Sequence, residues 1–307
     1  MPSLFFKDMY EEYKNCNLCP RNCGVNRCEG YGFCGEKTNI RIARAALHYW
    51  EEPCISGKDG SGTVFFSGCS LKCVFCQNSE LAFGKSGKSI SEERLAEIFY
   101  ELRDKGANNI NLVTADHFAP QVAKVIRSVK IKGFALPFIL NTGGYISAKQ
   151  LKIFDGIIDV YLSDFKYFSS FVSKKYSGAY DYPTIVEKAI DEMIRQQPKI
   201  EFNTDGLIQK GIIIRHLILP EHTDDSKKII KYLYERYKDG IYISIMNQYT
   251  PFDARKLKFP ELNRRVTAEE YADVVEFVLN LGVKNAYIQE EGTAEESFIP
   301  MFDYEGV

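Results

Sequence analysis

One short segment of this chain reads Phe66-Ser67-Gly68-Cys69-Ser70-Leu71-Lys72-Cys73-Val74-Phe75-Cys76-Gln77-Asn78. Its cysteines have the spacing Cys-x3-Cys-x2-Cys, which supplies three thiolates where a cubane iron–sulfur cluster needs four ligands. One iron would therefore lack a protein ligand, and an open position is typical of a reacting metal site rather than a structural one. The segment thus predicts a catalytic cluster; the alternatives are a chance group of cysteines and a zinc knuckle.

Apolar runs and amphipathic stretches alternate along the chain from Thr63 onward. The apolar runs, which we expect to be strands, are Thr63–Phe66, Ile110–Thr114, Pro137–Asn141, Ile157–Asp164, Ile212–Leu219 and Ile241–Asn247. The amphipathic stretches, which we expect to be helices, are Ser91–Lys105, Pro120–Lys130, Ser147–Phe154, Pro183–Gln196 and Asp224–Tyr237. Such alternation predicts βα units that feed a parallel sheet, and six units can be counted.

Three further segments complete the expected organisation. A last helix over Thr267–Leu281 precedes a seventh strand candidate, Asn285–Gln289. The segment Glu201–Lys210 is expected to be a loop or hairpin, because it contains Asn, Asp and Gly. Residues 1–60 are rich in Cys, Gly, Asn and Pro and are expected to be irregular.

Composition limits the classes of function. A length of 307 residues suits one α/β barrel with an appendage, or two ordinary domains. The net charge is −2 and no long Lys/Arg run is present, so no nucleic-acid partner is expected. No apolar stretch is long enough to cross a bilayer, and residues 1–15 lack the apolar core of a signal peptide. We therefore expect a cytoplasmic protein without a membrane partner.

All nine cysteines lie in the first quarter of the chain, at positions 16, 19, 23, 28, 34, 54, 69, 73 and 76. A secreted disulfide scaffold would not leave the rest of the chain without cross-links. Clustered cysteines in a cytosolic protein indicate metal or redox chemistry. An exposed cluster would be lost in air, so we expect an anaerobic setting.

A second set of cysteines has the spacing Cys16-x2-Cys19-x3-Cys23-x10-Cys34. Four thiolates close a metal site completely, and both a [4Fe–4S] cluster and a structural zinc ion fit such a set. A second cluster is our first expectation, zinc is the alternative, and the absence of metal is the third option. Cys28 and Cys54 have no assigned role; Cys54 is expected to be a buried thiol, or alternatively a ligand of the fourth iron or of the substrate.

The Cys69 segment resembles the cluster-binding loop of the radical S-adenosylmethionine (radical SAM) enzymes, and the aromatic Phe75 before the last cysteine strengthens the likeness. The resemblance implies that the open iron chelates SAM, which the reduced cluster cleaves to methionine and a 5′-deoxyadenosyl radical. It also implies a fold, an α/β partial (β/α)6 barrel, which the count of βα units supports independently. We expect a cysteine-rich module over residues 1–60, the barrel over 61–290 and a tail over 291–307.

The chain as a whole resembles a family of radical SAM proteins regarded as homologues of the pyruvate formate-lyase activating enzyme. The likeness rests on the Cys69 loop and on Cys16–Arg27, Gly32–Gly35, Ile55–Gly57, Gly60–Thr63, Asn141–Tyr145, Asp164–Tyr167, Gln248–Pro251 and Asn263–Thr267. It implies that Cys16, Cys19, Cys23 and Cys34 are the ligands of the auxiliary metal site.

The same resemblance assigns roles at the ends of the expected strands, where catalytic residues of parallel barrels lie. Asp164 and Lys166 match an Asp-x-Lys pair that contacts the methionyl end and the ribose of SAM; the alternative is an ordinary surface ion pair. Asn141 and Thr142 resemble an Asp-Thr pair that binds a monovalent cation beside SAM. Because Asn replaces Asp here, one negative charge is missing and the cation site is in doubt.

Two departures from the family pattern stand out. Radical SAM enzymes commonly carry a Gly-Gly-Glu-like run after the second strand, where this chain reads Thr114-Ala115-Asp116-His117. Asp116 could accept a hydrogen bond from the SAM amine, and His117 could bind substrate or act as an acid or base, the alternative being a structural histidine. The histidine that the activating enzymes carry after strand six is replaced by Asn247-Gln248-Tyr249.

These features predict a radical SAM enzyme that abstracts hydrogen from a protein or peptide, most specifically an activase that generates a glycyl radical on a partner enzyme. The alternatives are modification of a small metabolite or peptide and, from a different class, a non-catalytic iron–sulfur electron carrier. The expected cofactors are SAM, a [4Fe–4S] cluster and the second cluster or zinc. The expected electron donor is a flavodoxin or a ferredoxin-type protein.

Overall fold

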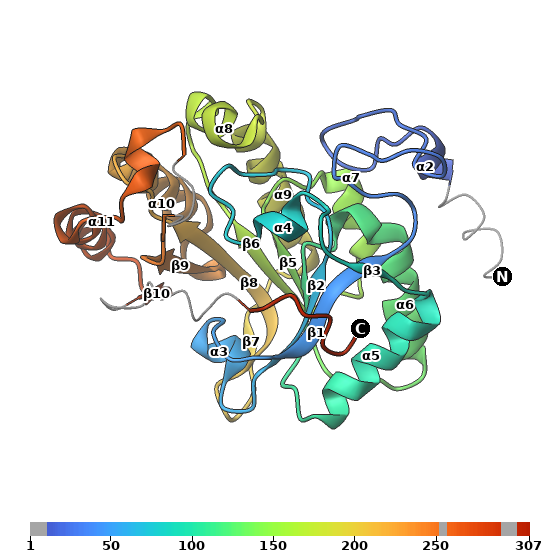
Figure 1. The fold of residues 1–307 in the computed structure, drawn as a ribbon. Coiled ribbons are helices and arrows are strands. Elements are labelled where there is room, and N and C mark those ends of the chain that lie inside the picture. Colours follow the sequence, from blue (N-terminus) through green and yellow to red (C-terminus); the bar gives the residue numbers. More distant parts are fainter. Residues whose placement is uncertain (1–10, 252–256, 290–299) are drawn as a thin grey trace.

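The computed structural model describes residues 11–251, 257–289 and 300–307. Within them one ten-stranded sheet has the order β10-β9-β8-β6-β5-β4-β2-β1-β3, and β7 pairs with β8 outside this path (Figure 1). The sheet curves around an interior and helices cover its outer face (Figure 1). The arrangement is the expected α/β partial barrel.

Six neighbouring strands of the sheet run parallel and form the predicted βα units. They are β2 (Ser61–Phe66), β4 (Ile110–Val113), β5 (Phe138–Thr142), β6 (Val160–Asp164), β8 (Ile208–Leu217) and β9 (Tyr242–Met246). The seventh candidate is also confirmed, because β10 (Ala286–Ile288) pairs parallel with β9. The predicted hairpin is present as well, since β7 (Glu201–Phe202) pairs antiparallel with β8.

The longer helices are α5 (Glu92–Asp104), α6 (Ala119–Ile131), α8 (Ser170–Ser177), α9 (Tyr182–Gln196), α10 (Thr223–Tyr237) and α11 (Ala268–Leu281). The short ones are α2 (Glu11–Lys14), α3 (Pro53–Ser56), α4 (Ser79–Ala82), α7 (Ala148–Leu151), η1 (Asp116–Phe118), η2 (Lys152–Phe154), η3 (Lys238–Gly240) and η4 (Pro260–Asn263). α11 begins with the capping box of Thr267 and Glu270 and ends at Gly282, which has the left-handed φ of +77°. In the described residues, no helix combines the length and apolar character that a bilayer span requires.

One strand lies inside the stretch that we expected to be irregular. β1 (Arg41–His48) pairs antiparallel with β2, and β3 (Lys88–Ser89) pairs with the start of β1. The sequence of β1 is rich in alanine, which has low strand propensity. The register shifts between Ile42 and Arg44, so the strand lacks a clean alternation of buried and exposed residues. The extended conformation of β1 therefore depends on its pairing with β2 and not on the local strand propensity of its residues.

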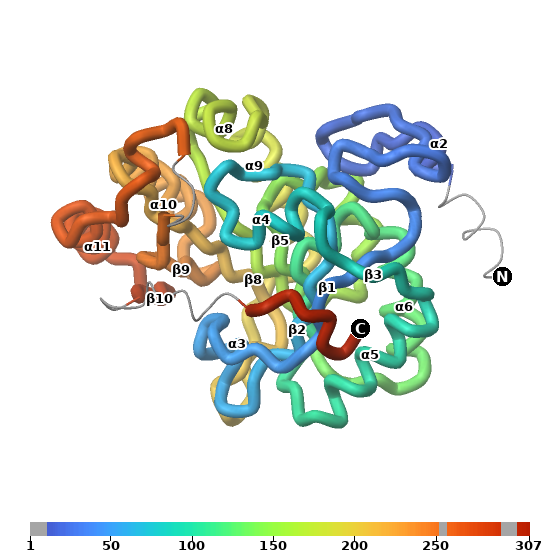
Figure 2. The backbone as a smooth tube through the Cα atoms, viewed as in Figure 1, coloured from blue at the N-terminus to red at the C-terminus, as the bar shows by residue number. Residues whose placement is uncertain are grey.

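The chain end lies along β1 (Figure 2). The backbone N–H of Ala45 donates to the carbonyl of Glu305 at 2.8 Å, and that of Tyr304 donates to Ala43 at 3.1 Å. Arg44 forms an ion pair with Asp303 at 2.7 Å. The segment covers backbone groups that an edge strand would otherwise expose. Residues 291–299 of the expected tail lie outside the described residues.

Side chains alternate between two environments along each parallel strand, as the period of two requires. Outward residues such as Leu140, Tyr161 and Ile214 pack against the helices. Inward strand residues pack with two residues of α3 into an apolar plug, formed by Cys54, Ile55, Ile139, Val160, Leu162, Ile208 and Ile213. Inward positions further along the strands carry polar side chains, and these line the site described next.

Candidate active site

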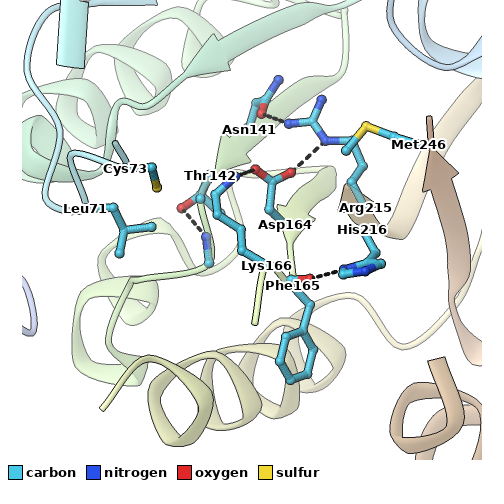
Figure 3. Close-up of polar contacts among 12 residues, drawn as sticks. Leu71, Cys73, Asn141, Thr142, Asp164, Phe165, Lys166, Arg215, His216 and Met246 are labelled. Carbon is cyan, nitrogen blue, oxygen red and sulfur yellow. Dashed lines mark hydrogen bonds and ion pairs between the residues drawn. The ribbon is translucent and has the colours of Figure 1, made fainter. Parts of the chain in front are cut away.

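A cavity of about 260 Å³ opens at the carboxyl ends of the parallel strands. It is lined by all three cysteines of the Cys69 segment and by Phe75, together with Asn141, Thr142, Asp164 and Arg215 from β5, β6 and β8, and Lys166 just after β6. Figure 3 shows Asp164, Arg215 and Asn141 pointing toward one another, with Lys166 and Cys73 nearby. We call this space the main cavity. Side chains of this chemistry are what a charged ligand beside a metal cluster needs.

A glycine allows the Cys69 loop to leave β2. Gly68 has φ +86°, and a Cβ there would lie 2.5 Å from the Glu36 side chain and 2.8 Å from the Cys34 carbonyl oxygen. Directly after it, the N–H of Cys69 donates to the Cys34 carbonyl at 3.1 Å. The loop is therefore built directly against the segment that carries the second cysteine set.

The other end of the loop is anchored on α8. The N–H of Val74 donates to the Tyr176 carbonyl at 2.8 Å, and the Ser177 hydroxyl contacts the Cys73 sulfur at 2.9 Å. The Phe75 ring lies edge-on to Tyr167, Tyr176 and Tyr249, with centroid distances of 6.3, 6.2 and 6.0 Å. Phe75 thus fixes the loop as well as lining the cavity.

The thiols of this loop suit a cluster, because they lie around a shared space. Burial, together with the neighbouring thiols, raises the pKa of Cys69 to about 11 and that of Cys76 to about 12. Such thiols stay neutral until positive iron is present to stabilise their thiolates. Of the described residues, no three His, Cys, Asp or Glu side chains converge on a single ion. All three cysteines line one cavity, and a cubane cluster takes its thiolate ligands from positions around it.

Asp164 and Lys166 are joined with Arg215 and Glu51 in one chain of charges (Figure 3 shows the first three). Lys166 pairs with Asp164 at 2.5 Å, Arg215 Nε donates to Asp164 at 2.9 Å, and Arg215 Nη1 donates to Glu51 at 3.1 Å. Burial alone would raise the pKa of Asp164, but Arg215 and Lys166 outweigh it and lower that pKa. Asp164 is therefore an anion, and Lys166, whose pKa is raised against burial by Asp164, is a cation.

The structure gives Asn141 and Thr142 defined partners. The amide oxygen of Asn141 accepts from Arg215 at 2.6 Å, and its nitrogen donates to Glu51 at 3.3 Å. The Thr142 hydroxyl donates to Asp116 at 2.7 Å. The oxygen at the position expected to bind a monovalent cation thus faces a guanidinium group instead.

Asp116 and His117 lie behind the cavity wall. They are 4% and 2% exposed, and neither is among the residues that line the main cavity. Burial raises the pKa of Asp116 to about 7 and lowers that of His117 to about 3, with Arg27 lowering the latter further. His117 Nε2 contacts the Ser67 carbonyl at 2.6 Å, next to the Cys69 loop. Their catalytic roles stay predictions; the contacts that the structure shows for them support the cavity wall.

Arg215, Glu51 and Glu52 were missed by the sequence analysis. Arg215 stands in the apolar run Ile212–Leu219, which we expected to be a strand. A lone charged residue in such a run was the available signal, because a buried charge requires a partner. Glu51 and Glu52 follow β1, inside the stretch expected to be irregular, and offered no pattern.

The second cysteine set is gathered in the segment before β1, which we call the cysteine module (residues 11–40). Cys16, Cys19 and Cys34 are buried, Cys23 is half-buried and Cys28 is exposed. Burial raises the pKa of Cys19 to about 12, and the nearby thiols of the other three raise it too. Cys54 lies apart, in the apolar plug. The four expected ligands lie in the same module and Cys28 is exposed, but among the described residues no three of them converge on a single ion, so their metal stays a prediction.

Comparison with known proteins gives the family. The sequence model of the Radical SAM superfamily matches residues 63–246, more than half of the chain. "Uncharacterized protein MJ0674" of Methanocaldococcus jannaschii is 28% identical over 271 residues, which cover 86% of this chain and 74% of that protein.

Solved structures of SuiB from Streptococcus suis are also similar. The form bound to the precursor peptide SuiA has 12% identity and a TM-score of 0.45 over 72% of this chain and 46% of that one. SuiB alone has 11% identity and a TM-score of 0.46 over 75% and 48%. The chain thus spans about half the length of these solved structures. From the extent of the superfamily match, the protein belongs to the radical SAM superfamily, enzymes that hold SAM at a [4Fe–4S] cluster.

Proposed function

We propose that Cys69, Cys73 and Cys76 bind the [4Fe–4S] cluster, that Asp164 and Lys166 hold SAM beside it, and that the enzyme abstracts hydrogen from a protein or peptide substrate. The leading specific version is an activase that generates a glycyl radical on a partner enzyme. One observation carries the proposal: the three thiols and the Asp164–Lys166 pair line the same cavity.

The chain's own residues supply binding and exclusion of water. The chemistry that a reduced cluster and SAM supply is a carbon radical able to take hydrogen from the substrate. Lys166 has two N–H donors beyond its bond to Asp164, and its charge complements a carboxylate. Asp164 retains lone pairs that can accept from hydroxyl groups. Because both side chains are largely buried, their contacts with a ligand are stronger than in water.

The rim of the cavity supports a polypeptide substrate. Trp50 lines the cavity and is 58% exposed, and Pro300 lines it beside Met301, which is 78% exposed. Phe33 and Phe83 do not line the cavity but are also exposed, and both rings lie under the Lys72 ammonium of the Cys69 loop. Exposed aromatic and methionine side chains around an active site are typical of a protein-binding surface. The resemblance to activating enzymes points the same way.

The other candidates are weaker. A small metabolite would need neither the exposed rim nor a partner. A non-catalytic electron carrier would gain nothing from the buried chain of Glu51, Arg215, Asp164 and Lys166, whose desolvation is costly. Membership of a superfamily of enzymes also makes a non-catalytic electron carrier the weaker candidate.

The proposal also includes partners outside the active site. An electron for the cluster must come from a donor, for which we propose a flavodoxin or a ferredoxin-type protein in an anaerobic cytoplasm. We further propose that Cys16, Cys19, Cys23 and Cys34 hold a second [4Fe–4S] cluster, or else a zinc ion. The module that would hold this second cluster contacts the Cys69 loop, and this position suits delivery of electrons to the catalytic cluster.

The test is anaerobic reconstitution with iron and sulfide, followed by SAM and dithionite. We expect 5′-deoxyadenosine to form, and to form faster with the correct substrate. Candidate substrates are glycyl radical enzymes, peptides and small metabolites, and a glycyl radical detected by electron paramagnetic resonance (EPR) identifies the activase. A reconstituted protein with four irons in the Cys69 site that forms no 5′-deoxyadenosine would contradict SAM cleavage.

A further inference from the structure

A second cavity of about 190 Å³ lies beside the main cavity. The two share the lining residues Trp50, Glu51, Arg215, Met246 and Gln248. Glu52, at the start of α3, and Ser244 and Tyr287, from β9 and β10, line only the second cavity. We call this space the second chamber. Because of the shared wall, a ligand in it would lie next to the place proposed for SAM.

The second chamber contains a carboxyl group with an unused oxygen. Glu52 is 8% exposed, and among the described residues its Oε2 atom has no hydrogen-bond partner. Within the same residues no Lys, Arg or His forms an ion pair with it. A charged oxygen that is buried without a partner is costly, even though Ser244 and the backbone lie close enough to this carboxyl group to lower its pKa. The side chain therefore calls for a proton or a positive charge.

The nearby guanidinium does not supply that charge directly. Arg215 donates to Asp164 at 2.9 Å, to Glu51 at 3.1 Å and to Asn141 at 2.6 Å. Its donors are thus directed at two carboxylates other than Glu52. Lys166 is paired with Asp164. Among the described residues that line the two cavities, Glu51, Glu52 and Asp164 are three carboxyl groups facing the two cations Lys166 and Arg215, and Glu52 forms no ion pair with either.

The excess of carboxyl groups over cations also affects the pKa of Glu52. Burial raises the pKa of Glu52, Arg215 opposes the rise, and Glu51 adds to it. A cationic ligand would supply an ion pair that the described residues do not provide to this carboxyl group.

We propose that the second chamber binds a positively charged nitrogen of the substrate, an ammonium or guanidinium group, with Glu52 as its counter-ion. This inference rests on the proposed function and names the chemical class of its substrate: a peptide side chain or terminus that bears such a group. The Ser244 hydroxyl and the Gln289 side chain offer further acceptors in the same chamber. The Trp50 indole lines the wall and can face a cation.

Binding of the charged nitrogen at Glu52 would position the substrate for the reaction. A substrate held by its charged nitrogen in the second chamber extends past the shared residues into the main cavity. A carbon a few bonds from the nitrogen would then lie where hydrogen abstraction occurs. Positioning of this kind is how binding energy at a remote group serves a reaction.

The test uses n-butylammonium as the probe, with 1-butanol as its uncharged analogue and butyrate as its anionic one. Binding to the full-length, reconstituted protein with SAM present is measured by ligand-observed saturation-transfer NMR. We expect butylammonium to bind at least tenfold more tightly than 1-butanol, and butyrate not to bind. Glu52→Gln keeps the size of the side chain and removes its charge, and it should weaken butylammonium binding at least tenfold. The matched control is Glu187→Gln on α9, a carboxyl outside the barrel whose pKa burial also raises.

The outcomes separate cleanly. Equal binding of butylammonium and 1-butanol by the parent protein overturns the inference, as does unchanged affinity in Glu52→Gln. If Glu52→Gln does not fold, the series of three probes on the parent still decides. Formation of 5′-deoxyadenosine by the parent is measured separately. A parent that binds the cation but does not cleave SAM contradicts the proposed function alone, and one that cleaves SAM without preferring the cation contradicts this inference alone.

Discussion

The two groups of cysteines lie in contact but differ in what surrounds them. Cys69, Cys73 and Cys76 line a cavity together with charged side chains. Of the five cysteines in the cysteine module, Cys16, Cys19 and Cys34 are buried and Cys23 is half-buried, and none of the five lines the main cavity. Three cysteines beside an open space suit a metal centre that binds a further ligand, whereas four expected ligands away from that space suit one that does not. The comparison teaches that the number of cysteines and their access to a cavity together separate a reactive site from an auxiliary one.

The largest expected effect comes from removing a ligand of the open site. Cys73→Ala leaves two thiolates for the catalytic cluster, so we expect reductive SAM cleavage to be abolished. Cys28→Ala is the matched control, because Cys28 is exposed and outside both sets. The measurement is 5′-deoxyadenosine formed after anaerobic reconstitution. If Cys73→Ala forms 5′-deoxyadenosine at the parent rate, the Cys69 loop does not hold the catalytic cluster.

The next largest effect concerns the charged side chains that lie beside the Cys69 loop and not beside the cysteine module. Lys166→Met should weaken SAM binding by about ten- to a hundredfold, the equivalent of about 1.5–3 kcal/mol for a charge-assisted hydrogen bond. The control is Lys130→Met, which breaks a Lys–Asp pair of 2.8 Å with Asp159, just before β6 begins. Isothermal titration with SAM compares the two variants. Equal SAM affinity in both would show that the pair at the end of β6 does not contact the ligand.

A smaller effect tests how the two regions are joined. Arg21, in the cysteine module, donates to the carbonyls of Ser70 at 2.7 Å, Ser177 at 2.8 Å and Gly178 at 2.6 Å. Arg21→Ala should lower the free energy of unfolding by about 1–3 kcal/mol and hasten loss of iron from the Cys69 site. Arg21→Lys should not restore the lost stability, because lysine lacks the planar fork of donors that arginine has.

Arg103→Ala serves as the control for Arg21→Ala, since Arg103 is exposed on α5 and pairs with its neighbour Asp104. Urea unfolding and the rate of iron release to a chelator measure the two variants. Identical iron release from the parent and Arg21→Ala would mean that the module does not support the catalytic loop.

The smallest effect lies behind the loop, at Glu261, which accepts hydrogen bonds from Lys175 and Tyr176. Although burial raises its pKa, these two partners lower it to about 2. A carboxyl with a lowered pKa in the folded state stabilises the protein at pH values above its unfolded pKa, near 4.5, and loses this contribution as the pH falls toward 2. Because Lys175 is largely exposed, we expect Glu261→Gln to cost only about 1 kcal/mol at pH 7.

Urea unfolding of the metal-free protein between pH 7 and pH 3 checks that prediction. The difference between the parent and Glu261→Gln should shrink as the pH falls. A difference that stays constant or grows toward low pH would show that the Glu261 carboxylate does not stabilise the contact with Tyr176.

Much of the barrel could be predicted because its strands and helices have strong periodic patterns. Ile110–Thr114 and Ile157–Asp164 were placed closely, and the helix over Thr267–Leu281 carried its own capping signals. β1 was missed because its conformation depends on pairing with β2 and not on its alanine-rich sequence. Long-range pairing of this kind leaves little local trace.

The site was predictable where residues follow a motif or a strand end, and not where contact depends on the fold. The Cys69 segment was singled out by its spacing, and Asp164 and Lys166 by the family resemblance and their position at the end of a strand; the structure places all of them on the main cavity, and their roles stay predictions. Arg215 was missed although its charge interrupts an apolar run, because its three partners come from β5, β6 and the segment after β1. Glu51 and Glu52 gave no signal until the barrel brought them to its interior.

The central claim is that the Cys69 site is open and the cysteine module is closed. The most direct measurement uses the double variant Cys16→Ala/Cys19→Ala, reconstituted anaerobically, with iron analysis and with EPR of the reduced protein before and after SAM is added. We predict that the variant loses the metal of one site only, retains about four irons, and shows a cluster signal that SAM changes. Loss of all iron from a folded variant, or a retained signal that SAM leaves unchanged, would contradict the account.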